Sequence, residues 1–117
     1  MALQDSQIAV IPMIEDQQAI DLAGDIARVE GIDALFIGRG DLTASFRDDP
    51  EAPAKVADIS RRVAAAAKAA DTPLMMLPTS KPDFEFATSL GATAIVLSSD
   101  HGFVRSAATV ALRDYGA

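Results

Sequence analysis

The sequence predicts an α/β protein in which four strand–helix units follow one another along the chain. Apolar runs of four to seven residues alternate with longer segments whose apolar residues recur every three or four positions. Strands that alternate with helices form a parallel sheet with right-handed crossovers. Ligands bind to such folds at the carboxyl ends of the strands, so functional residues are expected directly after each strand.

The first unit and the strand of the second unit occupy residues 8–41. Residues 8–14 form a continuous apolar run, which is typical of a strand buried on both faces. A helix is predicted from about Asp16 to Val29, and Gly31 is placed to end it. The second strand is predicted at 34–37. The apolar stripe of the helix consists of Ala19, Leu22, Ala23, Ile26 and Val29.

The second unit continues with a polar, proline-interrupted segment at 42–53, which predicts a loop with one short helical turn. A long helix is expected from there to about Ala70, followed by a strand at 73–77. One face of this helix carries Val56, Ile59, Val63, Ala66 and Ala70.

The helix of the third unit begins at Ser80, which with Asp83 three residues later resembles a capping box for a helix ending near Gly91; the fourth unit follows it. A strand is predicted at 93–97, and Ser98, Ser99 or Asp100 can cap the last helix. The stripe of that helix consists of Phe103, Val104, Ala107, Ala108 and Ala111.

Composition excludes several classes of function. The 17 acidic and 10 basic residues give a net charge of −7, whereas nucleic-acid binding needs clustered Lys and Arg. The absence of cysteine excludes disulfides, thiolate metal sites and a cysteine nucleophile. No apolar run approaches the roughly 20 residues of a membrane span, and the first residues do not resemble a signal peptide. We therefore expect a soluble, cytoplasmic protein that binds neither nucleic acid nor membrane.

Two carboxylates form the main candidate site. Glu15 follows the first predicted strand and Asp41 follows the second, and adjacent strands lie only about 5 Å apart. Two hard oxygen ligands with open positions suit Mg²⁺ or Mn²⁺. The structural alternative is that Glu15 favours a helix N-terminus while Asp41 caps a turn.

Two further features follow strands. Gly38, Arg39, Gly40 and Asp41 predict a sharp turn whose backbone amides could hold a substrate anion, with Arg39 as a possible partner; a purely structural turn is the alternative. His101 is the only histidine and follows the fourth strand, where acid–base work is one interpretation and an incidental position in a helix's first turn is the other.

Two motifs resemble the HpcH/HpaI aldolase family, to which citrate-lyase β-like proteins are related. The first covers residues 10–16 (VIPMIED) with 26–33 (IARVEGID), and the second covers residues 36–45 (FIGRGDLTAS). Leu90-Gly91-Ala92 and Ser98-Ser99-Asp100 also fit this pattern. The resemblance extends over nearly the whole chain and matches the second half of the family's proteins. It implies that residues 1–117 form a single C-terminal half-barrel domain, half of a TIM (β/α)₈ barrel.

The resemblance also implies an activity. Glu15 and Asp41 would hold Mg²⁺ or Mn²⁺, which would chelate pyruvate or another 2-oxoacid and stabilise the enolate formed on carbon–carbon cleavage or condensation with an aldehyde. The substrate carboxylate would meet the backbone amides of Gly40 and Asp41. The expected function is a metal-dependent aldolase; a citrate lyase-like or malyl-CoA lyase-like enzyme and a non-catalytic half-barrel module are the alternatives.

The sequence departs from the family in two ways. Arg39 replaces a proline or another residue common in the turn, and Phe46-Arg47 replaces the usual Leu-Gly. The half that carries the family's catalytic histidine has no counterpart here, and His101 is in the wrong part of the chain to replace it. Four strands that do not close leave two unpaired edges, so we expect a homo-oligomer or a complex with a partner N-terminal half.

Overall fold

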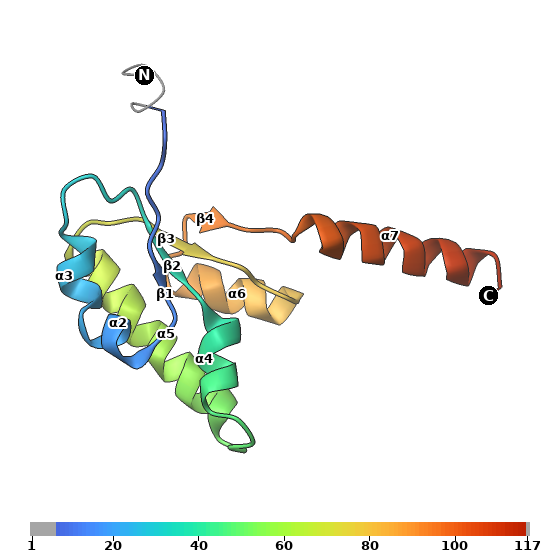
Figure 1. Cartoon of the computed structure of the whole chain (residues 1–117), viewed down its shortest axis with the longest axis horizontal. Coiled ribbons are helices and arrows are strands. Elements are labelled where there is room, and N and C mark those ends of the chain that lie inside the picture. Colours follow the sequence, from blue (N-terminus) through green and yellow to red (C-terminus); the bar gives the residue numbers. More distant parts are fainter. Residues whose placement is uncertain (1–6, 117) are drawn as a thin grey trace.

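The protein forms one parallel sheet with helices packed mainly on one face, as seen in a computed structural model that describes residues 7–116. The strands are β1 (Met13–Ile14), β2 (Leu35–Ile37), β3 (Leu74–Met76) and β4 (Ala94–Ile95), and they lie in the order β1-β2-β3-β4. Each neighbouring pair is parallel. The predicted series of four strand–helix units is therefore confirmed (Figure 1).

The helices are α2 (Gln17–Asp21), α3 (Ala23–Ala27), α4 (Arg39–Ser45), α5 (Ala52–Ala69), α6 (Lys81–Ser89) and α7 (Asp100–Asp114). Helices α2 to α6 connect the strands, α7 follows β4, and three of these helices begin at a capping side chain. The side chains of Asp16, Ser80 and Ser99 accept hydrogen bonds from the first turns of α2, α6 and α7 respectively. The predicted cap at Ser80 is confirmed, and Ser99 rather than Ser98 or Asp100 caps the last helix.

The core lies between the sheet and helix α5. Alternate strand residues point toward this helix and are buried: Ile14, Leu35, Ile37, Leu74 and Met76. The face of α5 that meets them carries Val56, Ile59 and Val63, as the sequence predicted. These contacts hold the carboxyl ends of β1 and β2 in place, and the candidate site follows those ends directly.

The opposite face of the sheet is only partly covered. Met13, Phe36, Met75 and Ala94 form one row across all four strands, because each is the register partner of the next. Met13 is 45% exposed, and the other three are half-buried. Strands β1 and β4 each have a neighbour on one side only.

Helix α7 extends away from the rest of the structure (Figure 1). It has no buried residue, so the prediction that its apolar stripe packs on the core is wrong. The reason is that α7 packs closely against no helix or strand formed by residues 7–116. The radius of gyration, 16.7 Å, accordingly exceeds the ~13 Å expected for a compact domain of this length.

The first unit differs from its prediction in two respects. Only residues 13–14 of the predicted strand 8–14 lie in the sheet, and Val10 is 48% exposed rather than buried. Pro12 supplies no amide hydrogen, and β1 is an edge strand, so pairing is limited. The predicted helix 16–29 is interrupted at Leu22, which changes the phase of its buried face. Ile20 and Ala27 are buried, whereas Leu22 and Val29 are exposed.

The second unit also corrects a prediction. A turn at 38–41 and then a loop with one short helical turn were expected, whereas residues 39–45 form helix α4 directly after Gly38. Leu42 anchors this helix because it is almost completely buried against the core. Within residues 7–116, no helix combines the length and apolar character needed to cross a bilayer.

Candidate metal centre at the strand ends

Glu15 and Asp41 are held side by side by the pairing of β1 with β2. Ile14 and Ile37 are register partners, and the amide of Gly38 donates a hydrogen bond to the carbonyl of Ile14 at 3.0 Å. Glu15 follows Ile14 directly, and Asp41 lies in the first turn of α4, which begins after Gly38. The sequence predicted that these two carboxylates meet above neighbouring strand ends, and the structure brings them together.

The proximity of the two carboxyl groups changes the acidity of Glu15. A hydrogen bond with the Asp41 carboxyl is the main cause that raises the pKa of Glu15 above its ordinary value; partial burial and repulsion from Asp41 and Asp16 add to it. A cation would stabilise such a site, because one divalent ion can neutralise both carboxylate charges.

The donor set fits a hard divalent cation. Mg²⁺ is commonly bound by one or two carboxylates, with water and substrate oxygens completing its coordination. No group of three or more His, Cys, Asp or Glu side chains suited to a metal occurs among residues 7–116. Glu15 and Asp41 would therefore supply two oxygen donors and leave the remaining positions open to water and a chelating substrate.

Gly38 is required by the close approach of α4 to β1. A Cβ atom added at this position would lie 2.7 Å from Cβ of Glu15 and 2.9 Å from its Oε2. Gly38 also offers no side chain to cap α4, and the first amides of a helix have no partner within the helix. Gly40 lies in this first turn, is exposed, and has open space where a Cβ would be.

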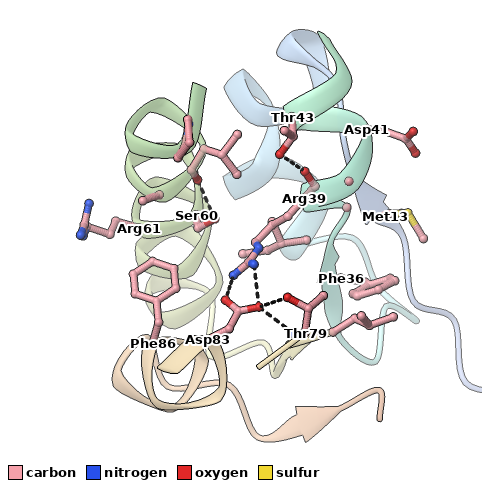
Figure 2. A pocket seen from close by; sticks show the side chains of 17 residues that line it. Met13, Phe36, Arg39, Asp41, Thr43, Ser60, Arg61, Thr79, Asp83 and Phe86 are labelled. Atoms are coloured by element: carbon pink, nitrogen blue, oxygen red, sulfur yellow. Dashed lines mark hydrogen bonds and ion pairs between the residues drawn. The ribbon is translucent and has the colours of Figure 1, made fainter. Parts of the chain in front are cut away.

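Arg39 is occupied by an ion pair that the sequence did not reveal. Its Nη1 and Nη2 donate to Oδ1 and Oδ2 of Asp83 at 2.5 and 2.8 Å (Figure 2). Asp83 lies in the first turn of α6 and also accepts a hydrogen bond from the backbone amide of Thr79. Burial raises the pKa of Asp83, but the hydrogen bonds from Arg39 and Thr79 outweigh it and hold this pKa below its ordinary value.

A cavity of about 850 Å³ is lined in part by Asp41 and contains the Arg39–Asp83 pair. Apolar side chains of β2, α5 and α6 form much of its wall, and its volume is in the range of small-molecule sites. It extends between α4, α5 and α6 (Figure 2). Its lining includes Phe36, Gly38, Arg39, Gly40, Asp41, Val56, Leu77, Thr79, Asp83 and Phe86.

His101 lies apart from the two carboxylates. Its side chain is 96% exposed, and it lines a separate, shallow depression at the start of α7 with Ser99 and Arg105. The acid–base role considered for His101 has no support from this position. Asp83 and Thr79 are the site-adjacent residues whose role sequence reasoning missed. The sequence did hold one signal for them. Both residues follow the third predicted strand, Arg39 follows the second, and the ends of neighbouring parallel strands lie close together.

Comparison with known proteins reveals one consistent group of relatives. Residues 3–107 match the family described as HpcH/HpaI aldolase/citrate lyase. The 5-keto-4-deoxy-D-glucarate aldolase of Citrobacter koseri is 33% identical over 111 residues, which cover 91% of this chain and 42% of that protein. The corresponding aldolase of Escherichia coli O6:H1 is 31% identical over 111 residues, again 91% of this chain and 42% of that protein.

Solved structures give the same result for the fold. The citrate synthase SbnG superposes with a TM-score of 0.82 at 25% identity, covering 99% of this chain and 48% of that one. An HpcH/HpaI aldolase/citrate lyase family protein from Burkholderia cenocepacia J2315 gives 0.78 at 27% identity, covering 96% and 44%. The chain thus spans less than half the length of these relatives. The predicted resemblance and the predicted half-barrel fold are confirmed.

Proposed function

Because the chain belongs to the HpcH/HpaI aldolase/citrate lyase family, we propose that it is the metal-binding, C-terminal half of a carbon–carbon lyase acting on 2-oxoacids. The observation that supports this most directly is the pair of carboxylates, Glu15 and Asp41, held together at the carboxyl ends of neighbouring parallel strands. The family generally depends on a divalent metal, and the two carboxylates would hold Mg²⁺ or Mn²⁺ here. Such an ion stabilises the negative charge that develops on the keto oxygen of a 2-oxoacid.

The protein's own groups would bind and orient the substrate. The amides of Gly40 and Asp41, at the uncapped start of α4, would donate hydrogen bonds to the substrate carboxylate. Gly38 would keep Glu15 close to this turn by leaving room for it. Pyruvate and a short aldehyde are the expected products of cleavage.

Metal binding is the first test of the proposal. Wild-type protein should bind Mn²⁺, as followed by the loss of the free Mn²⁺ signal in electron paramagnetic resonance. Glu15→Gln and Asp41→Asn should each abolish this binding, because each removes one of two charged donors. Asp58→Asn is the matched control: it removes one negative charge from an exposed ion pair with Arg61 on α5, and should leave binding unchanged. Unchanged binding in both site variants would refute the metal site.

Catalysis would depend on groups from outside this chain. The only histidine, His101, is exposed and remote from the carboxylate pair, so no histidine of this chain is placed to act as the base. We therefore propose that a separate N-terminal half completes the enzyme. Metal-dependent cleavage of a 4-hydroxy-2-oxoacid, which appears only when that half is added, would support this arrangement. A complete, metal-loaded complex without turnover would favour a non-catalytic half-barrel module instead.

The similarity to a citrate synthase, SbnG, at 25% identity keeps one alternative activity open. An enzyme related to citrate or malyl-CoA lyases would condense or cleave a larger substrate than pyruvate and an aldehyde. Measuring turnover of a 4-hydroxy-2-oxoacid against citrate or a malyl thioester, with the complete complex, would distinguish the two.

We also propose that the chain is not a free monomer. Strands β1 and β4 each have one unpaired edge, and the row Met13–Phe36–Met75 is only partly covered. Helix α7 exposes four large apolar side chains, and its C-cap residue Tyr115 is exposed as well; the four are Phe103, Val104, Val110 and Leu112. Native mass spectrometry should detect a dimer of the 12.2 kDa chain or a complex with a second chain. A monodisperse monomer with a cooperative thermal transition would contradict the proposal.

A further inference from the structure

Arg39 and Asp83 connect the segments that follow two neighbouring strands. Arg39 is the first residue of α4, after β2, and Asp83 lies in the first turn of α6, after β3. The guanidinium and the carboxylate form two parallel hydrogen bonds, which is the strongest geometry available to this pair. Their side chains are 24% and 13% exposed, so solvent screens the pair less than a surface ion pair.

The Asp83 carboxylate is itself fixed by its surroundings. It accepts hydrogen bonds from the amide and the hydroxyl of Thr79, at 2.8 and 3.3 Å, and its own amide donates to the hydroxyl of Ser80. The carboxylate is thus a rigid anchor on the β3–α6 segment. Arg39 bonds to this anchor across 44 residues of sequence.

Arg39 and Asp41 point to different sides of α4. Residues two apart on a helix do not face each other, and Figure 2 shows Arg39 directed into the cavity toward Asp83 while Asp41 points away from it. The positive charge of Arg39 is therefore neutralised by Asp83 rather than aimed at the carboxylate pair. The ion pair can still affect the position of Asp41 through the backbone of the first turn of α4. No side-chain cap fixes this turn.

We propose that Arg39 is a positioning residue whose ion pair with Asp83 fixes the first turn of α4 and thereby holds the Asp41 carboxylate beside Glu15. This rests on the proposed metal-binding function, which it deepens. The substrate-binding role expected for Arg39 from the sequence becomes secondary, because both terminal nitrogens of its guanidinium group already donate hydrogen bonds to Asp83.

Mn²⁺ affinity separates positioning from a simple electrostatic effect. Removing a positive charge near a cation site tightens binding, whereas removing a negative charge weakens it. Positioning makes a different prediction, because either substitution breaks the same connection. Arg39→Met and Asp83→Asn should both weaken Mn²⁺ binding by about tenfold, the order expected when support of a metal ligand is lost. The double variant should be no weaker than either single variant, and Arg39→Lys should retain an intermediate affinity.

The matched control is Arg62→Met. Arg62 forms an ion pair with Asp21 across 41 residues, but both side chains are more than half exposed, so its removal should leave Mn²⁺ affinity unchanged. Tighter binding in Arg39→Met, or unchanged binding in both Arg39→Met and Asp83→Asn, would overturn the proposal.

A metal-free measurement keeps this proposal separate from the proposed function. Amide hydrogen exchange of residues 38–46 should be faster in Arg39→Met and Asp83→Asn than in the wild type and in Arg62→Met. If wild-type protein binds no Mn²⁺, the metal site is refuted, while faster exchange of this segment still supports the fixing of α4 by Arg39. Unchanged exchange in both variants refutes the positioning role whatever the metal result.

Discussion

Replacing Gly38 with alanine tests whether close packing of α4 against β1 sets the spacing of the two carboxylates. The added Cβ would lie 2.7 Å from Cβ of Glu15, 2.9 Å from Oε2 of Glu15 and 3.0 Å from Cγ of Met13. Gly38 has φ −81° and ψ 67°, so its backbone does not occupy the left-handed region that penalises alanine. Any effect of the substitution is therefore a steric effect on its neighbours.

The size of the effect follows from these distances. Nonbonded carbons are most favourable at about 3.5–4.0 Å, so the two Cβ atoms must separate by about 1 Å. The Cβ of Glu15 is attached to the backbone and cannot rotate away, so β1 and the start of α4 have to move apart. Overpacked sites typically lose about 1–3 kcal/mol of stability, and we expect a loss in this range. Mn²⁺ affinity should fall by about tenfold or more, because the spacing of the two ligands changes.

Urea unfolding and Mn²⁺ titration measure the two consequences, and Gly40→Ala is the matched control. A Cβ at position 40 meets nothing within 4 Å, and Gly40 lies in the first turn of α4. Alanine there should be neutral or stabilise the helix by up to about 1 kcal/mol. If Gly38→Ala matched Gly40→Ala in both unfolding midpoint and Mn²⁺ affinity, the packing argument would be wrong.

Three further substitutions have defined outcomes. Asp41→Asn should stabilise the metal-free chain at neutral pH while abolishing Mn²⁺ binding. The raised pKa of Glu15 opposes folding increasingly as the pH rises above its unfolded pKa and fully above its folded pKa, so the gain should disappear on acidification in urea-unfolding series. Asp83→Asn should be less stable than wild type at pH 7. Because the pKa of Asp83 is lowered, the difference is complete above the unfolded value of about 3.9 and should vanish as the pH falls through the folded value. Arg47→Gly should increase the free energy of unfolding by up to about 1 kcal/mol and so raise the thermal midpoint. Arg47→Ala should not, because position 47 has φ 51°, which glycine tolerates and alanine does not.

The sequence was sufficient for the parts of the fold that depend on local pattern and burial. The stripe Val56–Ile59–Val63 identified α5 and its buried face, because that helix packs on the sheet in the way the pattern assumes. The same reasoning failed for α7, whose stripe includes Phe103 and Val104. An apolar stripe indicates that a helix needs a partner surface, but it does not say that the partner belongs to the same chain.

The candidate site was only partly predictable for a related reason. Glu15 and Asp41 could be paired from strand order alone, because neighbouring parallel strands end at the same edge of a sheet. The helical conformation of residues 39–45 was missed, since Gly38 and Gly40 suggested a turn. The Arg39–Asp83 pair depends on side-chain directions at two helix starts, which strand order does not specify. The structure explains why the family usually has glycine where this chain has Arg47. Arg47 adopts a left-handed backbone conformation just after α4, which glycine favours.

The geometry of the carboxylate pair is set by the part of the protein that this chain packs by itself. Ile14 and Ile37, the residues at the ends of β1 and β2, are fully or almost fully buried on the helix-covered face of the sheet. Among residues 7–116, the opposite face is less well covered: Met13 is exposed and Phe36 is half-buried. The proposed metal ligands therefore depend on the covered face, whereas enclosure of a substrate depends on whatever covers the open one. It follows that the isolated chain should bind Mn²⁺, and that tight binding of an oxoacid should require a second chain.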